Sequence, residues 1–447
     1  MAARVKPEHV TVRMYQVGFG DCFLVSFAYP RPLDDGRRER HVLIDFGSTH
    51  APHDQKLDWV AIARRVADDC GGKLDAVVVT HRHKDHLSGF ANDEAAAIVG
   101  ELAPRLIVRP WTEDPEIPAT ATGPVGAASR QLRVGLATGQ EFANDLALAF
   151  DAQARGLPGH VRQLAEDQLK NAEAVERLQR WAAEHDGEYL HAGMRSKLEE
   201  VVPGMSAEVL GPPTVDQFPD VVNARARDPE YWMLYQGLVT SGLSATALGI
   251  DDDDGEDEDD EWPAPRPTHS WVPALDIPPG PARWLAERLQ SQQVQSLQRI
   301  VRSLDDALNN TSLILLLTVG NRRLLFPGDA QIENWRFTLD RLPKDKKLRN
   351  RLQSVDLYKV GHHGSRNASP RSLLKLWGDD KRLVSLMSTS AGVHGKSEET
   401  AVPRATLVAA LEKGTRLFST EDLGPTEAVT VEADTAGKEG FVPTPPS

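Results

Sequence analysis

The sequence predicts a mixed α/β (α+β) protein, and three observations support this prediction. Short apolar runs of the kind found in strands dominate the N-terminal part of the chain, 1–110. Between residues 113 and 202 the chain becomes rich in Ala, Leu, Gln, Glu and Arg, a composition typical of helices. From residue 313 onward, stretches with strand and helix patterns alternate along the chain.

The N-terminal part, 1–110, is predicted to consist mostly of strands. Strands are predicted at 11–17, 22–28, 41–46, 74–80 and 106–108, and a helix at 58–67. The first two strands flank Gly18-Phe19-Gly20-Asp21, which indicates a β-hairpin. The run at 74–80, LDAVVVT, is nearly continuous and β-branched, which suits a strand buried on both faces. It ends directly at a group of histidines.

Two insertions are predicted in the middle of the chain. The first, 113–202, is helical, and no chemistry is assigned to it. A strand at 207–210 separates it from the second, 214–300, an irregular and partly disordered excursion. The second contains DDDDGEDEDDE at 251–261, with ten acidic residues. We interpret this run as a solvated loop. The alternative is a polyanion mimic that covers a basic site or binds a basic partner.

The C-terminal part is predicted to alternate strands with helix. Strand patterns at 313–319 and 323–326 flank Gly320-Asn321, a strong hairpin signal. Further elements are predicted at 354–360, 382–387, 403–412, 415–419 and 428–432. Residues 1–435 are expected to form a single domain with the two insertions inside it, and 436–447 a loose tail.

Composition limits the function classes. The chain has 447 residues, 40% hydrophobic and 26% charged, as in ordinary globular proteins. Without the ten charges of the acidic run, the net charge of −14 becomes −4, so a nucleic-acid partner is not excluded. No stretch reaches the roughly 18 apolar residues that span a bilayer. The start has no secretory signal pattern, and two cysteines fit a reducing compartment, so we expect a cytoplasmic protein without a membrane partner.

The strongest chemical signal follows the buried strand. The sequence T-H-R-H-K-D-H-L-S-G places three histidines and an aspartate within six residues, namely His81, His83, Asp85 and His86. Neutral imidazole and carboxylate are the usual protein ligands of zinc. In an extended loop, His81 and His83 point to one side, while Asp85 and His86 start the next turn and can face a second ion. Chance clustering at this spacing, directly after such a strand, is the weaker interpretation.

Two later segments offer further ligands. The predicted hairpin runs into Pro327-Gly328-Asp329, and the strand at 354–360 runs into Gly361-His362-His363-Gly364. Alone, Pro-Gly-Asp is an ordinary turn. After a hairpin, and in this order along the chain, Asp329 and His363 are predicted ligands.

Together these segments resemble the metallo-β-lactamase superfamily, whose signature is HxHxDH. Within it, the chain is most similar to the hydrolase domain of the competence protein ComEC. The segments that carry this likeness are QVGFGDC at 16–22, NNTSL at 309–313, KVGHHGS at 359–365 and the closing strand-helix-strand pattern at 383–424. The resemblance covers roughly residues 8–110 and 200–435, without the insertions.

The resemblance implies an αββα sandwich with two divalent metal ions, Zn²⁺ or alternatively Mn²⁺, at one edge. It implies that His81 and His83 bind one ion, that Asp85, His86 and His363 bind the other, and that Asp329 lies between them. His362 is then a group near the ligands or in contact with substrate, although the two histidines could exchange roles. Asp85, His362 and Lys359 are the residues we expect to act in catalysis.

The chain departs from the superfamily in one respect. Many members have a further histidine ligand just before the hairpin, where this chain has Asn309 and Asn310. An amide oxygen is a poorer zinc ligand than imidazole, so one ion is expected to bind more weakly, or a harder ion such as Mn²⁺ to serve. The remaining candidates lie upstream and are expected to be ordinary surface or insertion histidines: His160, His185, His191 and His269.

Several other roles stay open at the level of sequence. Asp45 either bonds a ligating histidine or is a turn residue before Gly47. Lys359 and Ser365 could touch a phosphate, and for Lys359 an exposed strand position is equally compatible with the sequence. A basic cluster either tracks a nucleic-acid backbone or forms a solvated helix face. Its members are Arg341, Lys344, Lys346, Lys347, Arg349 and Arg351.

We therefore predict a hydrolase that uses a metal-activated hydroxide. The resemblance implies a nuclease that cleaves phosphodiester bonds of nucleic acid, in DNA processing or anti-phage defence. The alternatives are a hydrolase of small esters, lactones or phosphodiesters, and a non-catalytic metal-containing subunit that binds a partner. The helical insertion offers a surface for a protein partner or a homodimer.

Overall fold

The computed structural model describes residues 5–52, 56–115, 172–214, 217–218, 309–393, 401–421 and 423–444. The acidic run at 251–261 and nearly all of the predicted irregular insertion at 214–300 lie outside the described residues. The same holds for His160 and His269 and for residues 116–171 of the predicted helical insertion.

The described chain is built on two mixed sheets. The larger has eight strands in the order β14-β13-β1-β2-β3-β4-β5-β6. Its strands β3 to β6 are parallel to one another, whereas β13, β1, β2 and β3 pair antiparallel. Its strands are β1 (His9–Tyr15), β2 (Cys22–Ala28), β3 (Glu39–Phe46), β4 (Ala76–Val78), β5 (Leu106–Pro110), β6 (Gly187–Leu190), β13 (Ala428–Asp434) and β14 (Val442–Thr444).

The smaller sheet has six strands in the order β12-β11-β10-β9-β8-β7. Strands β9 to β12 are parallel, while β7, β8 and β9 pair antiparallel. The predicted hairpin around Gly320-Asn321 is confirmed as β8–β9. The strands are β7 (Met205–Gly211), β8 (Ile314–Val319), β9 (Arg322–Phe326), β10 (Leu357–Lys359), β11 (Val384–Met387) and β12 (Arg416–Ser419).

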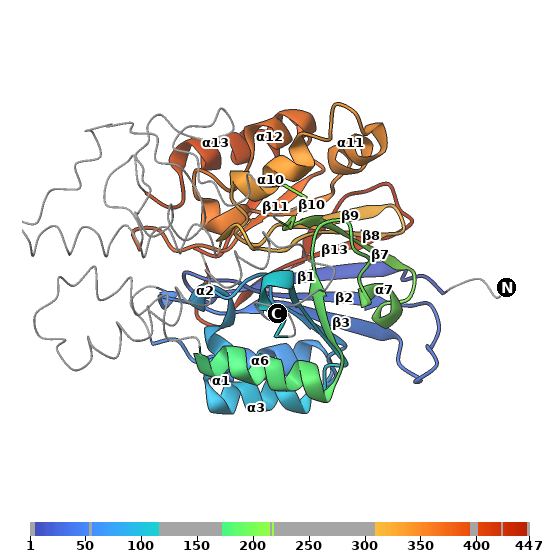
Figure 1. Cartoon of the computed structure of the whole chain (residues 1–447), viewed down its shortest axis with the longest axis vertical. Helices are drawn as coiled ribbons and strands as arrows, with labels where there is room; N and C mark the ends of the chain where they lie inside the picture. Colours follow the sequence, from blue (N-terminus) through green and yellow to red (C-terminus); the bar gives the residue numbers. More distant parts are fainter. Residues whose placement is uncertain are drawn as a thin grey trace, which may run out of the picture.

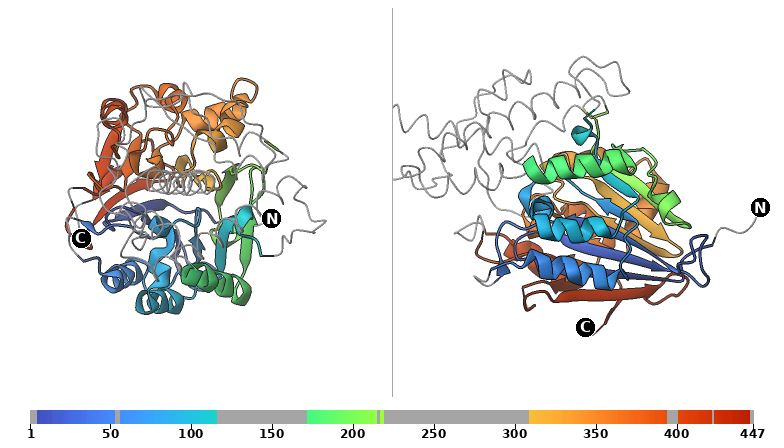
Figure 2. Two further views of the ribbon diagram at one scale, coloured as in Figure 1. Left: turned by 60° about the vertical axis from the view of Figure 1, so that its left-hand side comes forward. Right: turned by 90° about the horizontal axis from the view of Figure 1, so that it is seen from below.

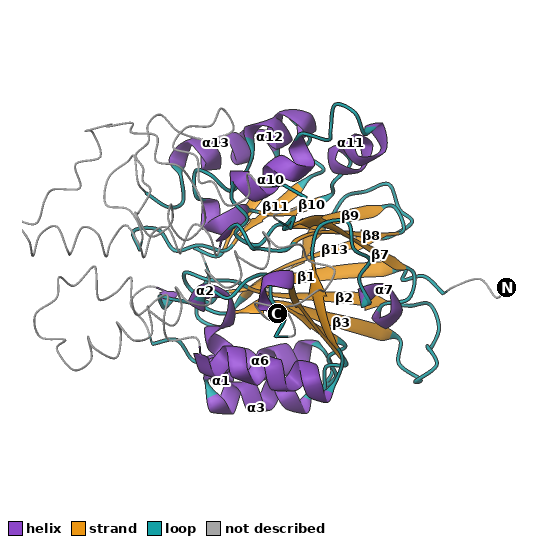
Figure 3. Ribbon diagram, in the orientation of Figure 1, coloured by secondary structure: helices purple, strands orange, loops and turns teal. Residues whose placement is uncertain are grey.

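Helices cover the outer face of each sheet, so the described chain has four layers (Figure 1). Strand residues at alternate positions, such as Val10, Val12 and Met14, form the apolar core between the two sheets. One outer core packs helices on the larger sheet, and another packs helices on the smaller sheet. The left view of Figure 2 and the colouring of Figure 3 show the helices outside and the strands between, and the right view of Figure 2 looks onto the helices that cover the larger sheet. The mixed α/β class predicted from the sequence is thereby confirmed.

Three helices cover the larger sheet and four cover the smaller one among the described residues. On the larger sheet lie α1 (Trp59–Asp69), α3 (Asp93–Glu101) and α6 (Ala172–Glu184). On the smaller sheet lie α10 (Ile332–Leu339), α11 (Lys346–Gln353), α12 (Arg371–Trp377) and α13 (Ala405–Gly414). Short elements complete the described chain: α2 (Lys84–Leu87), η2 (Ser88–Ala91), η3 (Trp111–Glu113), α7 (Leu198–Val201) and η5 (Gly361–Gly364).

The direction of the parallel strands determines where the predicted ligands lie. In both sheets the loops that leave the carboxyl ends of the parallel strands carry the predicted ligands: α2 follows β4, and η5 follows β10. Parallel strands end at one edge of a sheet, and this edge is where open α/β sheets commonly bind ligands. The two sheets bring these edges together, which places segments from distant parts of the sequence side by side.

Two parts of the chain differ from what the sequence suggested. In the predicted helical insertion 113–202, residues 187–190 form β6, which extends the larger sheet parallel to β5. Leu178 of α6 is buried in the core of that sheet. Likewise, the prediction of a loose tail over 436–447 is wrong for Val442–Thr444, which pairs with β13, and for Phe441, which is fully buried. Short segments of this kind join a sheet through long-range pairing, which leaves little local pattern.

Two expectations from composition can be compared directly with the described chain. Its helices include none that is both long and apolar enough to cross a membrane. Cys22 and Cys70 are both free thiols and both buried.

Candidate metal centre

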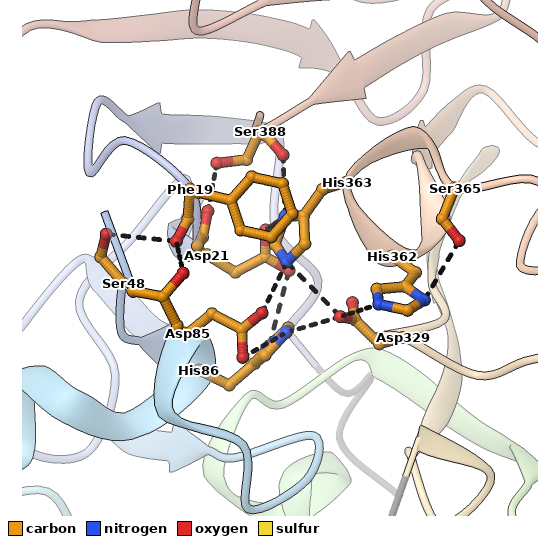
Figure 4. Close-up of polar contacts among 12 residues, drawn as sticks. Phe19, Asp21, Ser48, Asp85, His86, Asp329, His362, His363, Ser365 and Ser388 are labelled. Atoms are coloured by element: carbon orange, nitrogen blue, oxygen red, sulfur yellow. Dashed lines mark hydrogen bonds and ion pairs between the residues drawn. The ribbon is translucent and has the colours of Figure 1, made fainter. Parts of the chain in front are cut away.

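Three separate segments meet at the edge described above (Figure 4). The loop and helix after β4 supply His81, His83, Asp85 and His86; the turn after β9 supplies Asp329; and η5 after β10 supplies His363. The six predicted ligands thus come together, and each of them is at most 8% exposed. His86 and His363 both lie against Asp329, although His86 belongs to a distant part of the sequence.

The first group of candidate ligands consists of Asp85, His86, Asp329 and His363, which we call the carboxylate group. Nε2 of His86 lies 3.0 Å from Oδ2 of Asp329, and Nε2 of His363 lies 3.4 Å from the same oxygen. Oδ2 of Asp85 lies 3.1 Å from Nε2 of His363. Atoms bound at about 2.0–2.2 Å to a tetrahedral zinc ion are about 3.3–3.6 Å apart. The separation of 3.4 Å falls in this range, and those of 3.0 and 3.1 Å are slightly shorter, so a small outward shift of the ligands would admit a shared cation.

The second group consists of His81 and His83, with Asn309 beside them, and we call it the imidazole group. The rings of His81 and His83 are 4.6 Å apart, and together with Asp85 these histidines can surround one ion. Asn309 is fully buried and lies next to His83. Of the two asparagines singled out in the sequence, Asn309 therefore lies beside the candidate ligands, whereas Asn310 bonds Glu333.

The ring nitrogens that face away from the carboxylate group are already occupied. Nδ1 of His86 lies 2.8 Å from Oδ2 of Asp45, and Nδ1 of His363 lies 2.9 Å from the carbonyl oxygen of Ser388. With Nδ1 bonded to an acceptor, each ring presents Nε2 to the centre, which is how proteins orient histidine ligands. Of the two interpretations of Asp45, the geometry favours the one in which it orients a candidate ligand.

Asp45 also fixes the loop that carries the histidines. Its two carboxylate oxygens accept hydrogen bonds from the backbone N–H and the hydroxyl of Thr80, at 2.7 and 2.8 Å. The turn that carries Asp329 packs on the same threonine. Gly328 has φ +56°, and a Cβ atom there would lie 2.8 Å from the Thr80 side chain. Only glycine meets both conditions without strain, so the local backbone requires the glycine that precedes Asp329.

Three polar atoms that face the centre have no hydrogen-bond partner within the described chain, although two of them form an ion pair with each other. Nε2 of His81 and Nε2 of His86 make no hydrogen bond there, and Oδ2 of Asp329 accepts none. Leaving a buried polar atom unsatisfied costs about 1–3 kcal/mol, so several together call for a ligand. Imidazole nitrogens and carboxylate oxygens satisfied by one kind of partner point to a divalent cation. The residues present therefore fit a metal ion.

The two groups differ in their electrostatics. Burial acts to lower the pKa of His86, but the carboxylates of Asp329, Asp45 and Asp85 raise it well above its ordinary value. His363 behaves in the same way, and Asp329 and Asp21 raise its pKa to about 10 despite burial. In contrast, burial lowers the pKa of His81 and that of His83. In the absence of a metal ion, protons on His86 and His363 thus balance the negative charge of the neighbouring aspartates. A bound cation would take over that role.

Asp21 and Lys359 form a buried ion pair behind the centre, which the sequence did not predict. Asp21 is fully buried, and its oxygens lie 3.6 Å from Nδ1 of both His86 and His363. It pairs with Lys359, whose Nζ lies 2.5 Å from Oδ2 of Asp21 and 3.1 Å from Oδ1 of Asp329. The sequence signal for Asp21 was its place after two glycines in the hairpin turn. The alternative of an exposed strand position is wrong for Lys359, because the residue is 2% exposed.

His362 and Ser365 form the more open side of the site. The His362 side chain is 22% exposed, and its Nε2 lies 3.8 Å from Oδ2 of Asp329. Its Nδ1 lies 3.2 Å from the hydroxyl of Ser365. Burial lowers the pKa of His362 to about 4, so the ring is neutral at neutral pH. Both His362 and His363 have left-handed backbones, with φ 45° and 52°, strain of the kind that gathers at functional sites.

The other predicted candidates lie elsewhere. His185 is exposed after α6, and Nδ1 of His191 lies 3.0 Å from the carbonyl oxygen of Ala192. The basic cluster lies on and before α11, which leads into the amino end of β10, so it sits at the edge opposite the centre (Figure 1). Its nearness to Asp329 in sequence is therefore not nearness in space, because α10 carries the chain away.

We compared the chain with protein-family models and with curated proteins. No protein-family model matches the chain, and no curated protein matches its sequence.

Proposed function

We propose that this protein is a metal-dependent hydrolase with a metallo-β-lactamase-like fold that holds two divalent metal ions, Zn²⁺ or Mn²⁺. One observation carries the proposal. Histidines and aspartates from three distant segments converge at one sheet edge, with buried ligand atoms close enough to one another to surround a cation. The four-layer arrangement, the HxHxDH spacing and the place of Asp329 after a hairpin all agree with the fold that the sequence resembles.

Bound divalent ions would lower the pKa of a coordinated water toward about 7 and would stabilise the leaving oxygen. The chain's own residues have separate tasks in this proposal. His81 and His83 hold one ion, His86 and His363 hold the other, and Asp329 offers Oδ2 between them. Asp85 joins His86 and His363 as a ligand of the second ion. These two histidines lower the pKa of its carboxyl group despite its burial, so the group stays charged, as a ligand must.

His362 is the residue we assign to substrate contact. It is more exposed than the candidate ligands, it lies 3.8 Å from Asp329, and it is neutral near pH 7. A neutral imidazole held by Ser365 can donate to, or accept from, a substrate oxygen without adding a charge to the centre. In this proposal it orients the scissile group above the ions.

We propose nucleic acid as the substrate class, with phosphodiester cleavage as the reaction. Support for this step comes from the likeness of the segments at 16–22, 309–313 and 359–365 to the ComEC hydrolase domain. A phosphodiester also suits two adjacent cations, which can grip both the attacking and the leaving oxygen.

The direct test is cleavage of single- and double-stranded DNA by the purified full chain with Zn²⁺ or Mn²⁺. We expect cleavage that His83→Ala lowers at least about 100-fold, because a lost ligand costs several kcal/mol of stabilisation. The matched control is His185→Ala, an exposed histidine away from the centre, which should cleave normally. If the chain binds metal but hydrolyses only small esters or phosphodiesters, these compounds replace nucleic acid as the proposed substrate. If it binds metal and hydrolyses none of these substrates, a non-catalytic binding subunit is favoured.

A further inference from the structure

A third group of possible ligands lies directly behind the metal centre, and it differs from the other two. Asp21, Asp45 and His86 have ligand atoms close enough to surround an ion. However, each residue of this group already has a close partner inside the protein. Nδ1 of His86 and Oδ2 of Asp45 bond each other at 2.8 Å, and Asp21 pairs with the ammonium group of Lys359.

Lys359 is bound on all sides. Its Nζ lies 2.5 Å from Oδ2 of Asp21, 3.1 Å from Oδ1 of Asp329 and 3.0 Å from the carbonyl oxygen of Gly328. An ammonium group has three N–H donors, so these three acceptors use all of them and leave none for a substrate phosphate. The side chain is 2% exposed at the end of β10, so its cation lies in the protein interior.

The two oxygens of Asp329 therefore have different partners. Oδ1 is held by Lys359, whereas Oδ2 faces Nε2 of His86 at 3.0 Å and Nε2 of His363 at 3.4 Å. Rotation of the carboxylate would break the bond to Lys359. A carboxylate fixed in this way offers one oxygen to the centre rather than two.

We propose that Lys359 is a positioning residue for the metal centre rather than a catalytic one. Its ammonium group holds Oδ1 of Asp329, so that Asp329 presents Oδ2 alone to the ions, and it takes the place that a third cation would otherwise occupy beside Asp21. The inference rests on the two-ion centre of the proposed function, but not on any substrate. It gives a reason why three adjacent groups of possible ligands would hold two ions rather than three.

Charge balance makes the choice of variant important. Lys359→Met alone removes the closest partner of the buried Asp21, so this variant is expected to be strongly destabilised. The informative pair is Asp21→Asn, which keeps Lys359 on Asp329, and the double variant Asp21→Asn/Lys359→Met, which removes the buried ion pair as a unit. The matched control is Asp356→Asn/Arg322→Met, because Arg322 is also buried and pairs with Asp356 at 3.2 Å at the opposite end of β9.

The experiment measures the number and affinity of bound Zn²⁺ ions by chelator competition, and the absorption spectrum of the Co²⁺-loaded chain. We expect two ions in the natural chain, in Asp21→Asn and in the control. In Asp21→Asn/Lys359→Met we expect one ion to bind about 10–100-fold more weakly, the usual effect of losing a residue that orients a ligand. Its Co²⁺ spectrum should also change, because Asp329 gains a second free oxygen.

Equal affinities and equal spectra for Asp21→Asn and the double variant would overturn the inference. A natural chain that binds no divalent ion would overturn both this inference and the metal centre of the proposed function. Normal metal binding without DNA cleavage would contradict only the proposed substrate class. The proposed role of Lys359 would be unaffected. Circular dichroism of each variant identifies loss of folding as the cause of any lost binding.

Discussion

The carboxylate group and the imidazole group lie side by side, yet the protein prepares them differently. In the carboxylate group, Asp45 and Ser388 orient the histidines, and Lys359 fixes Asp329. The imidazole group combines two histidines of lowered pKa with an asparagine in place of a third. One group is rich in negative charge and pre-oriented, while the other is close to neutral. We infer that the first holds its ion tightly and the second exchanges its ion more readily.

Asp329 should have the largest effect, because its Oδ2 lies within 3.4 Å of Nε2 of both histidines of the carboxylate group, and we propose that it lies between the two ions. Binding a zinc ion to four ligands is worth about 10–16 kcal/mol, hence roughly 3–4 kcal/mol for each ligand. Asp329→Asn keeps the shape but loses the charge, and we expect ion binding to weaken several-hundred-fold. Zinc titration with a competing chelator measures this. Two ions bound at unchanged affinity would show that Asp329 is not a ligand.

The pH dependence of binding should separate the two groups. Carboxylates raise the pKa of His86, and that of His363 to about 10, so both rings carry protons at pH 7 in the metal-free chain. An ion must displace these protons, so its affinity should rise as the pH rises, by up to about 100-fold per unit for two protons. His81 and His83 have lowered pKa values and are already neutral, so binding there should barely change above pH 7.

Calorimetric titration at pH 6.5, 7.5 and 8.5 in buffers of different ionisation enthalpy counts the protons released by each ion. If the affinities of the two ions changed with pH by the same factor, the electrostatic difference between the groups would be contradicted.

Asp45 should have an intermediate effect. Asp45→Asn removes the charged acceptor of Nδ1 of His86 and weakens the hold on Thr80. Changes of this kind usually lower metal affinity about 10–100-fold. Here the loss should fall mainly on the carboxylate group, because Asp45 bonds His86 directly and reaches the loop before His81 only through Thr80. A Co²⁺ titration that resolves two spectral components would show which ion is weakened. Equal weakening of both would mean that the two groups form one coupled site.

Asn309 should have the smallest effect, and in the opposite direction. Asn309→Asp has the same shape and replaces an amide by a carboxylate, which is a better ligand for divalent ions. We expect the ion of the imidazole group to bind about tenfold more tightly, whereas Asn309→Ala should not gain affinity. Dissociation rates of Zn²⁺ from the two variants provide the measurement. No difference between them would place Asn309 outside the centre.

Sequence reasoning succeeded where the information is local. His81, His83, Asp85 and His86 lie within six residues after a buried strand, so their grouping needs no knowledge of the fold. Asp329 and His363 were found because each follows a strand with a recognisable turn, and the order along the chain matched a known pattern. The sequence does not decide whether Asp45 bonds a ligating histidine or is a turn residue, since a strand end before a glycine is compatible with both roles.

Other parts of the site had no local signal. Lys359 has a sequence context that also suits an exposed strand residue, and only packing against Asp21 and Asp329 makes it an internal cation. The basic residues before β10 looked close to the centre in sequence, and α10 carries them to the opposite edge. The strand β6 was hidden inside a helical composition, because this short segment acquires strand character from its neighbour β5.

The sequence by itself determined which side chains can bind a metal and which turns carry them, because donor type and backbone conformation are local properties. The tertiary structure decided which of these side chains face one another, which atoms already have partners, and which cation balances each carboxylate. Those are properties of burial and of strand pairing between distant parts of the chain, and a buried charge finds its partner only when both sheets are in place.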